Sequence, residues 1–278
     1  MPLLTLYKRL AQLLCAMLIL LVIPLPAGAA PIELTASVRA SLNKTMETSG
    51  PELAASLSKT YEQLGASIKA ERSVDQTVKS LQYSSEGALL EVRKQIQQVG
   101  AARIDFLKKE LEQTKQQYKP LLALSQSLSK QAAAAKSFGQ KELAAALRSQ
   151  ASQIKPAVQL AKQDIKNREA KLKAARAEAA ERKKRLRGML AGIDTVKVKR
   201  KAERSTISSL SKSLAAEWSS AKQALRKRDG VNAHKSLSKA LALSGQVNTR
   251  KQTLLTLEQS IADIIRLTRA ELARISSV

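Results

Sequence analysis

"VQLAKQDIKNREAKLKAARAEAAERKKRLRGMLAGI", residues 158–193 of this 278-residue chain, keeps one side-chain spacing without interruption. Apolar or long-stemmed residues recur at alternating intervals of three and four, the 3.5-residue period of a helix that buries one seam against other helices. The seam consists of Val158, Ala161, Ile165, Arg168, Leu172, Ala175, Ala179, Arg182, Leu186, Met189 and Ile193. Two arginines and three alanines make it a weak surface for dimerisation. It therefore predicts packing against helices of the same chain, where arginine stems cover apolar surface.

The rest of the sequence also has the composition and spacing of helices. Alanine, leucine, lysine, glutamine, glutamate and arginine dominate, and all of them are good helix formers. Helical spacing of apolar residues recurs from Leu53 to Leu111, from Ile207 to Leu225 and from Leu254 to Ile275. The nearest approach to a strand, DTVKVK at 194–199, is too short to be stable without a partner. We therefore predict an all-α fold, an elongated antiparallel helical bundle of long, coiled-coil-like helices.

Glycine and proline residues mark the expected breaks between helices. The sequence predicts turns at SGPE (49–52), SFGQ (137–140), KRDGVN (227–232) and SGQVN (244–248), with interruptions near SSEG (84–87) and Gly192. Pro120 and Pro156 are expected to end helices, because the residue before a proline is pushed out of the α region. The resulting division is a leader at 1–29, an N-terminal helical region at 30–155, a basic long helix at 156–204 and a C-terminal helical hairpin region at 205–278.

The first residues follow the order of a secretory signal peptide. A Lys-Arg pair precedes an apolar core at residues 10–23 and a small-residue site, AGA, at 27–29. Cleavage is expected between Ala29 and Ala30, because a cut one residue later would place Pro31 beside the scissile bond. The alternative is an uncleaved membrane anchor, although the core is shorter than the ~20 residues of a spanning helix. In both cases the sequence predicts an exported protein, either secreted or associated with the cell envelope.

The chain is strongly basic. Its formal charge is +25, and loss of a leader containing Lys8 and Arg9 lowers this to +23. Such an excess attracts polyanions, which after export would be wall polymers, lipopolysaccharide, anionic lipid head groups or extracellular DNA. Residues 155–204 contain seventeen basic and six acidic side chains. They predict either a polyanion-binding strip or a solvated helix face. The strip would consist of Lys171, Arg182, Lys183, Lys184, Arg185, Arg187, Lys197, Lys199, Arg200 and Lys201.

Neither catalytic nor metal-binding residues are predicted. His234 is the only histidine, and no serine, cysteine or carboxylate motif accompanies it as general acid–base chemistry would require. The only cysteine, Cys15, lies in the leader, so the usual ligand set of a structural metal site is missing. Trp218 lies on an apolar stripe and is expected in the core rather than as a platform for sugars. No cofactor is expected.

These features favour an exported, non-enzymatic, basic helical protein with a structural or adaptor role, associating through charge with anionic cell-envelope polymers. Specific nucleic-acid recognition is not expected, because the few scattered aromatic residues do not form the stacking platforms that single-strand binders use. The alternative is a membrane-active or lipid-binding helical protein, resembling a pore-former. That class needs a wide apolar face, whereas these stripes are narrow and diluted by alanine. The oligomeric state stays open.

Overall fold

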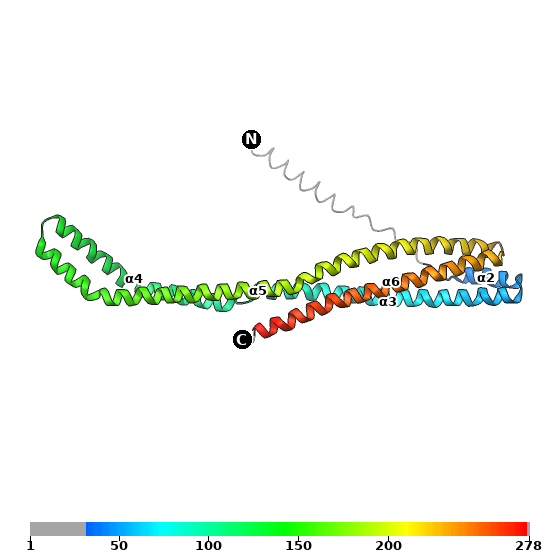
Figure 1. The fold of residues 1–278 in the computed structure, drawn as a ribbon, viewed down its shortest axis with the longest axis horizontal. Coiled ribbons are helices and arrows are strands. Elements are labelled where there is room, and N and C mark those ends of the chain that lie inside the picture. The colour runs from blue at the N-terminus through cyan, green and yellow to red at the C-terminus, as the bar shows by residue number, and fades with distance from the viewer. Residues whose placement is uncertain (1–31, 277–278) are drawn as a thin grey trace, which may run out of the picture. The chain divides into compact units, whose positions relative to one another are not determined.

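The computed structural model describes residues 32–276, and all regular structure in this range is α-helical (Figure 1). The helices are α2 (Ala36–Glu47), α3 (Pro51–Gln98), α4 (Ala101–Ser137), α5 (Lys141–Arg226) and α6 (Gly230–Ser276). The predicted all-α helical bundle is confirmed. No helix in the described range is both long and apolar enough to cross a membrane. The expected signal peptide and its cleavage site at Ala29 and Ala30 lie outside the described residues.

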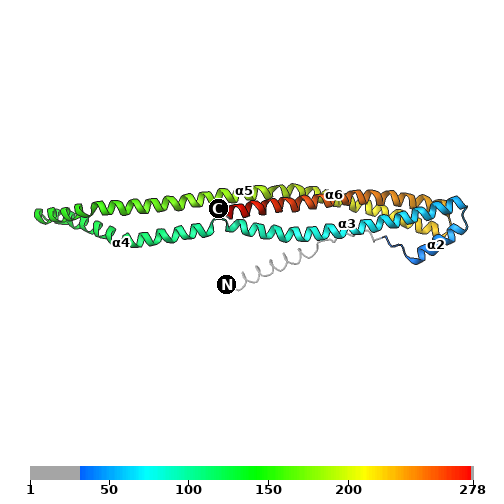
Figure 2. The same cartoon turned by 90° about the horizontal axis from the view of Figure 1, so that it is seen from below.

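The described residues form two compact units. Unit 1 contains residues 32–84 and 194–261, and unit 2 contains residues 85–193 and 262–276. Unit 1 is built from α2, the first part of α3, the end of α5 and the beginning of α6. Unit 2 is built from the remainder of α3, α5 and α6 together with all of α4. In both views α4 runs back beside α5 as an antiparallel hairpin (Figures 1 and 2).

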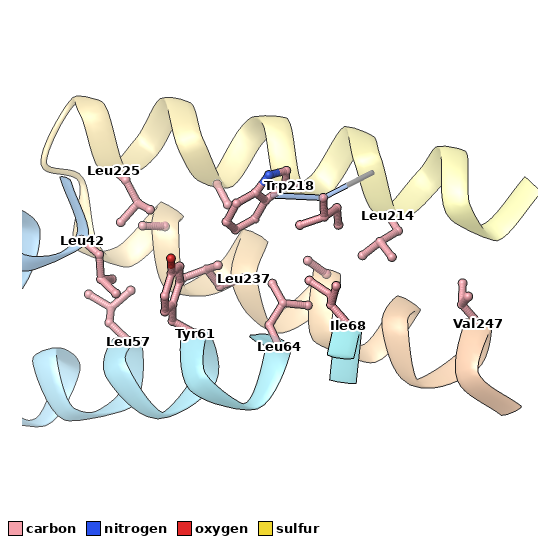
Figure 3. Packing of buried hydrophobic residues seen from close by; sticks show 14 residues of the cluster. Leu42, Leu57, Tyr61, Leu64, Ile68, Leu214, Trp218, Leu225, Leu237 and Val247 are labelled. Atoms are coloured by element: carbon pink, nitrogen blue, oxygen red, sulfur yellow. The ribbon is translucent and has the colours of Figure 1, made fainter. Parts of the chain in front are cut away.

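Unit 1 has a well-defined apolar core, to which each of its helices contributes (Figure 3). Leu57 and Leu64 of α3 are fully buried, and so is Leu237 of α6. Trp218 is 4% exposed and lies beside Tyr61, with ring centroids 6.4 Å apart. The expectation that this tryptophan belongs to the core is confirmed. Burying a side chain of leucine size stabilises the fold by roughly 1.5–3 kcal/mol, so this cluster is the main apolar support of unit 1.

Three of the predicted turns are present, and their backbone geometry explains why each helix stops. At the α4–α5 turn, Gly139 adopts a left-handed φ of 74°, and the N–H of Gln140 donates to the carbonyl of Ala135 at 3.0 Å. At the α5–α6 turn, Arg228 takes the same role with φ 58°. These bonds satisfy carbonyls that a helix end leaves without partners. Pro51 begins α3 at the first-turn position that proline tolerates.

The predictions that proline ends two helices are wrong. Pro120 lies inside α4 and Pro156 inside α5. An interior proline costs about 3 kcal/mol through a lost hydrogen bond and a steric clash, but it can bend a helix without ending it. Figure 1 shows α4 and α5 both changing direction before they reach their common turn. The two helices remain packed on each other through and beyond the prolines, and this packing offsets the local cost.

The predicted break at residues 244–248 is also wrong, and so are the interruptions expected near 84–87 and Gly192, since α6, α3 and α5 continue through them. Ser244 and Asn248 face α3 instead of forming a turn. The Ser244 and Ser67 hydroxyls lie 2.7 Å apart, and Asn248 Nδ2 donates to the Ser67 carbonyl at 3.0 Å. The Ser244 hydroxyl and the Asn248 Nδ2 group find partners across the bundle, so these residues do not need the local backbone bonds that favour a turn.

One break, at Val99 and Gly100 between α3 and α4, was not predicted from the sequence. Gly100 has a φ of +75°, and a Cβ at this position would lie 2.7 Å from Ala179 Cβ on α5. A side chain here would suffer both backbone strain and a steric clash. The glycine therefore ends α3 and lets the turn approach α5 closely.

The seam predicted from residue 158 to residue 193 is confirmed. All of its eleven positions are buried or half-buried within unit 2, including the two arginines. Arg168 Nη1 pairs with Glu110 Oε1 at 3.2 Å, while its Nε pairs with Asp164 Oδ1 at 3.2 Å. The arginine stems thus cover the interior while their charged ends bind carboxylates on α4 and α5.

Candidate polyanion-binding strip

The ten residues of the predicted strip all lie on α5. The six from Lys171 to Arg187 belong to unit 2, and the four from Lys197 to Lys201 belong to unit 1. A regular helix places residues four positions apart on one face. Lys183 and Arg187 therefore share a face in unit 2, and Lys197 and Lys201 share one in unit 1.

Two arginines of the strip are paired with acids in unit 2. Arg182 Nη2 lies 2.6 Å from Glu178 Oε1, and the same glutamate binds Arg103 of α4 at 3.2 Å. Arg185 Nη2 lies 3.1 Å from Glu271 Oε1 on α6. These guanidinium groups are partly neutralised, so they contribute less to the outward field than their sequence positions suggest.

Arg200 is directed into unit 1. Its side chain is 17% exposed, and its Nη1 donates to both carboxylate oxygens of Glu258, at 3.1 and 3.3 Å. The Glu258 side chain is 1% exposed, and Arg204 Nη2 approaches it at 3.9 Å. A buried carboxylate requires such a partner because its desolvation is costly. Arg200 therefore acts inside the bundle.

The other seven strip residues form no ion pair within the described part of the chain. Five of them are exposed and two, Lys183 and Lys197, are half-buried. The seven are Lys171, Lys183, Lys184, Arg187, Lys197, Lys199 and Lys201. Their ammonium and guanidinium groups are the basic groups of the strip that are best placed to meet an external anion.

Several acidic side chains point inward instead of neutralising this surface. In unit 1, Lys251 is buried on α6 and its Nζ pairs with Glu71 Oε1 and Asp75 Oδ2 of α3, both at 2.6 Å. Glu203 of α5 is largely buried as well and pairs with Arg250 at 3.4 Å. Since these carboxylates are already paired with Lys251 and Arg250, they do not pair with the basic residues of the strip.

This internal network of ion pairs was not predicted, although the sequence contains a signal for it. Buried positions of α6 in unit 1 follow alternating intervals of four and three: Ala233, Leu237, Ala240, Ser244, Val247, Lys251, Leu254, Glu258 and Ile261. Lys251 and Glu258 continue the apolar spacing, so the same period that located the seam also marks them as buried. Buried charges are rare unless they are paired, which predicts partners on neighbouring helices.

His234 lies half-buried near the start of α6, just after Asp229, which caps that helix. Asn232 donates to Asp229 through its backbone N–H and its side-chain amide, and these bonds lower the pKa of the aspartate. Residues 32–276 contain no group of three or more histidine, cysteine, aspartate or glutamate side chains arranged to hold a metal ion. No protein family, curated protein or solved structure matches this chain.

Proposed function

We propose that this chain is an exported, non-enzymatic, basic helical protein of structural or adaptor type. It binds anionic polymers of the cell envelope through the basic residues of the strip on α5. One observation supports this most directly: seven basic side chains of the strip form no ion pair in the described range, whereas Arg182, Arg185 and Arg200 each pair with a glutamate.

Binding of this kind depends on charge. Each anionic group neutralised by a lysine or arginine releases a condensed counterion, so affinity falls log-linearly with salt concentration. The strip has no aromatic cluster among its basic residues to recognise a particular sequence. Affinity for polymers of equal charge density should therefore be similar, whatever their sequence.

The test compares two variants with the same loss of charge. The first replaces Lys183, Lys184 and Arg187 by glutamine. The control replaces Lys59, Lys69 and Lys79, three exposed lysines of α3. The strip variant should leave a heparin-type or wall-polymer column at distinctly lower salt than wild type, with a shallower salt slope and unchanged helicity. The control should shift less. If both variants shifted the eluting salt concentration equally, the strip would be only a solvated helix face and not a binding site.

Export is tested separately by the mass of the protein recovered outside the cytoplasm. A chain that begins at Ala30 supports cleavage by signal peptidase. Recovery of the full 278-residue chain in membranes supports an uncleaved anchor. Recovery from the cytoplasm alone would contradict the localisation.

Binding to anionic lipid head groups is the second candidate, and one observation favours it. Phe138 is 81% exposed at the α4–α5 turn, with Lys136 and Lys141 on either side of it in the sequence. An aromatic ring flanked by lysines suits an interface of acyl chains and anionic head groups. Flotation with phosphatidylglycerol vesicles tests it. Replacing Phe138 by serine should reduce binding, and an unchanged bound fraction would remove this candidate.

A further inference from the structure

We propose that a hollow in unit 2 binds a single phosphate group, and that Arg274 contributes to this site together with two arginines of the strip. The hollow has a volume of about 280 Å³ and is lined by Arg182 and Arg185 of α5 and by Glu271, Arg274 and Ile275 of α6. The inference rests on the proposed function, because Arg182 and Arg185 belong to the strip. It adds a defined subsite to a surface that otherwise recognises only charge.

The acid of this hollow is the most buried of its charged groups and holds two of the arginines in place. Glu271 is 14% exposed, whereas the Arg185 and Arg274 side chains are 63% and 68% exposed. Glu271 Oε1 forms an ion pair with Arg185 Nη2 at 3.1 Å and accepts from Arg274 Nη2 at 3.0 Å, and Oε2 accepts from Arg274 Nε at 3.0 Å. The carboxylate thus fixes guanidinium groups from two helices beside each other.

The lining is positively charged, with three guanidinium groups against one carboxylate. A guanidinium has five N–H donors, and Arg182 and Arg185 each bind their acidic partner through Nη2 alone. Further donors of these two arginines remain for an anion in the hollow. Because one water occupies about 30 Å³ of liquid, the hollow has room for a phosphate group and several waters.

The chemistry favours phosphate among the anions of a cell envelope. Arginine presents a planar fork that matches phosphate and carboxylate oxygens, and it is less strongly hydrated than lysine. A planar carboxylate satisfies two donors in one plane, whereas the tetrahedral oxygens of phosphate can meet donors arriving from α5 and from α6. The phosphate could come from a phosphodiester polymer or from a lipid head group, which have this group in common.

A pair of variants separates a shaped site from general charge. Arg274→Gln removes a guanidinium from the hollow. Arg266→Gln is the matched control, since Arg266 also lies on α6, is 71% exposed and pairs with an acid three residues away, Asp263. Each variant loses one charge. Arg274→Lys keeps the charge but loses the fork. The dissociation constant of inorganic phosphate is measured by NMR titration at constant ionic strength, with chloride as the competing anion.

Arg274→Gln should weaken phosphate binding by about tenfold, the lower end of what a lost hydrogen bond between charged groups produces. Arg274→Lys should recover only part of the affinity, and Arg266→Gln should change it by less than about twofold, because Arg266 does not line the hollow. Equal effects of the two glutamine variants, or wild-type affinity no greater for phosphate than for chloride, would overturn the site. Unchanged circular dichroism excludes misfolding as the cause.

The same variants keep this inference separate from the proposed function. If wild type is retained by anionic polymers but Arg274→Gln and Arg266→Gln bind phosphate alike, the phosphate site in the hollow is refuted and polyanion binding by the strip is still supported. If inorganic phosphate binds through Arg274 but the protein retains no anionic polymer, the phosphate site is supported and the proposed function is refuted. Parallel measurements with a soluble phosphodiester polymer and with phosphatidylglycerol vesicles show which source of phosphate depends on Arg274.

Discussion

The ion pair between Arg200 and Glu258 should behave as a structural element of unit 1. Replacing Glu258 by leucine leaves the Arg200 side chain, 17% exposed, without the two hydrogen bonds that it donates to Glu258 in the native protein. Breaking a buried pair by removing one partner costs about 3–5 kcal/mol. Since whole domains are stable by about 5–15 kcal/mol, this loss would be a large fraction of the stability of unit 1.

Removing both partners should have the opposite outcome. In Arg200→Met with Glu258→Leu, neither charge is left without its partner, and apolar side chains of similar size fill the space. Such replacements are often neutral or stabilising by about 1–4 kcal/mol. The double variant should therefore be at least as stable as wild type, although each single variant is destabilised. This non-additivity is the signature of a direct interaction.

Trp218 allows the effect to be measured in unit 1 itself. It is the only tryptophan of the chain and is 4% exposed in the unit 1 core. Urea unfolding followed by its fluorescence gives the free energy of unfolding for each variant. A Glu258→Leu midpoint equal to wild type, or a double variant as unstable as the singles, would refute the reasoning. The double variant keeps the net charge, so its retention on a polyanion column should match wild type if Arg200 acts only inside the bundle.

Three further variants test unit 2. Gly100→Ala should destabilise the protein by about 2–4 kcal/mol, through left-handed backbone strain and the clash with Ala179. Gly188 lies in open space on α5, so Gly188→Ala should stabilise the protein by about 0.5–1 kcal/mol. Equal shifts of the two variants in thermal unfolding would contradict the role given to Gly100. The hydrogen bonds from Arg274 lower the pKa of Glu271 below its ordinary 4.5, so its stabilising effect is present above 4.5 and is lost as pH falls through the folded pKa. The difference in unfolding midpoint between wild type and Glu271→Gln should therefore shrink on acidification, and a constant difference would exclude the ion pair as its cause.

The fold class was predictable because one physical signal, the 3.5-residue period, persists over long stretches. Breaks were less predictable because local preferences compete with packing over tens of residues. Pro120 and Pro156 cost only a few kcal/mol each, so the packing of α4 and α5 maintains the helices through them. Gly100 was missed because its role depends on Ala179, which is distant in sequence.

The candidate site was predictable in part. Charge density located the basic strip of α5, but it could not show that Arg200 would pair inside the bundle with an acid 58 residues away. It also could not place Arg274 beside Arg182 and Arg185, since only the packing of α6 on α5 brings these residues to one hollow. The seam spacing of α6 did contain the information that Lys251 and Glu258 are buried, because both occupy positions of the apolar repeat.

The placement of these two buried charges explains how α6 finds its register in unit 1. A seam that repeats every seven residues would pack almost as well after a slip of one heptad. Lys251 and Glu258 are one heptad apart and have opposite charges. A slip in one direction would bring Lys251 to Arg200, and a slip in the other would bring Glu258 to Glu71 and Asp75. Both contacts join like charges in a buried setting, so a single register is favoured. The carboxylates that enforce it pair with Arg200 and Lys251, so the same arrangement that specifies the register keeps them from pairing with Lys199 and Lys201, the exposed strip lysines of α5 in unit 1.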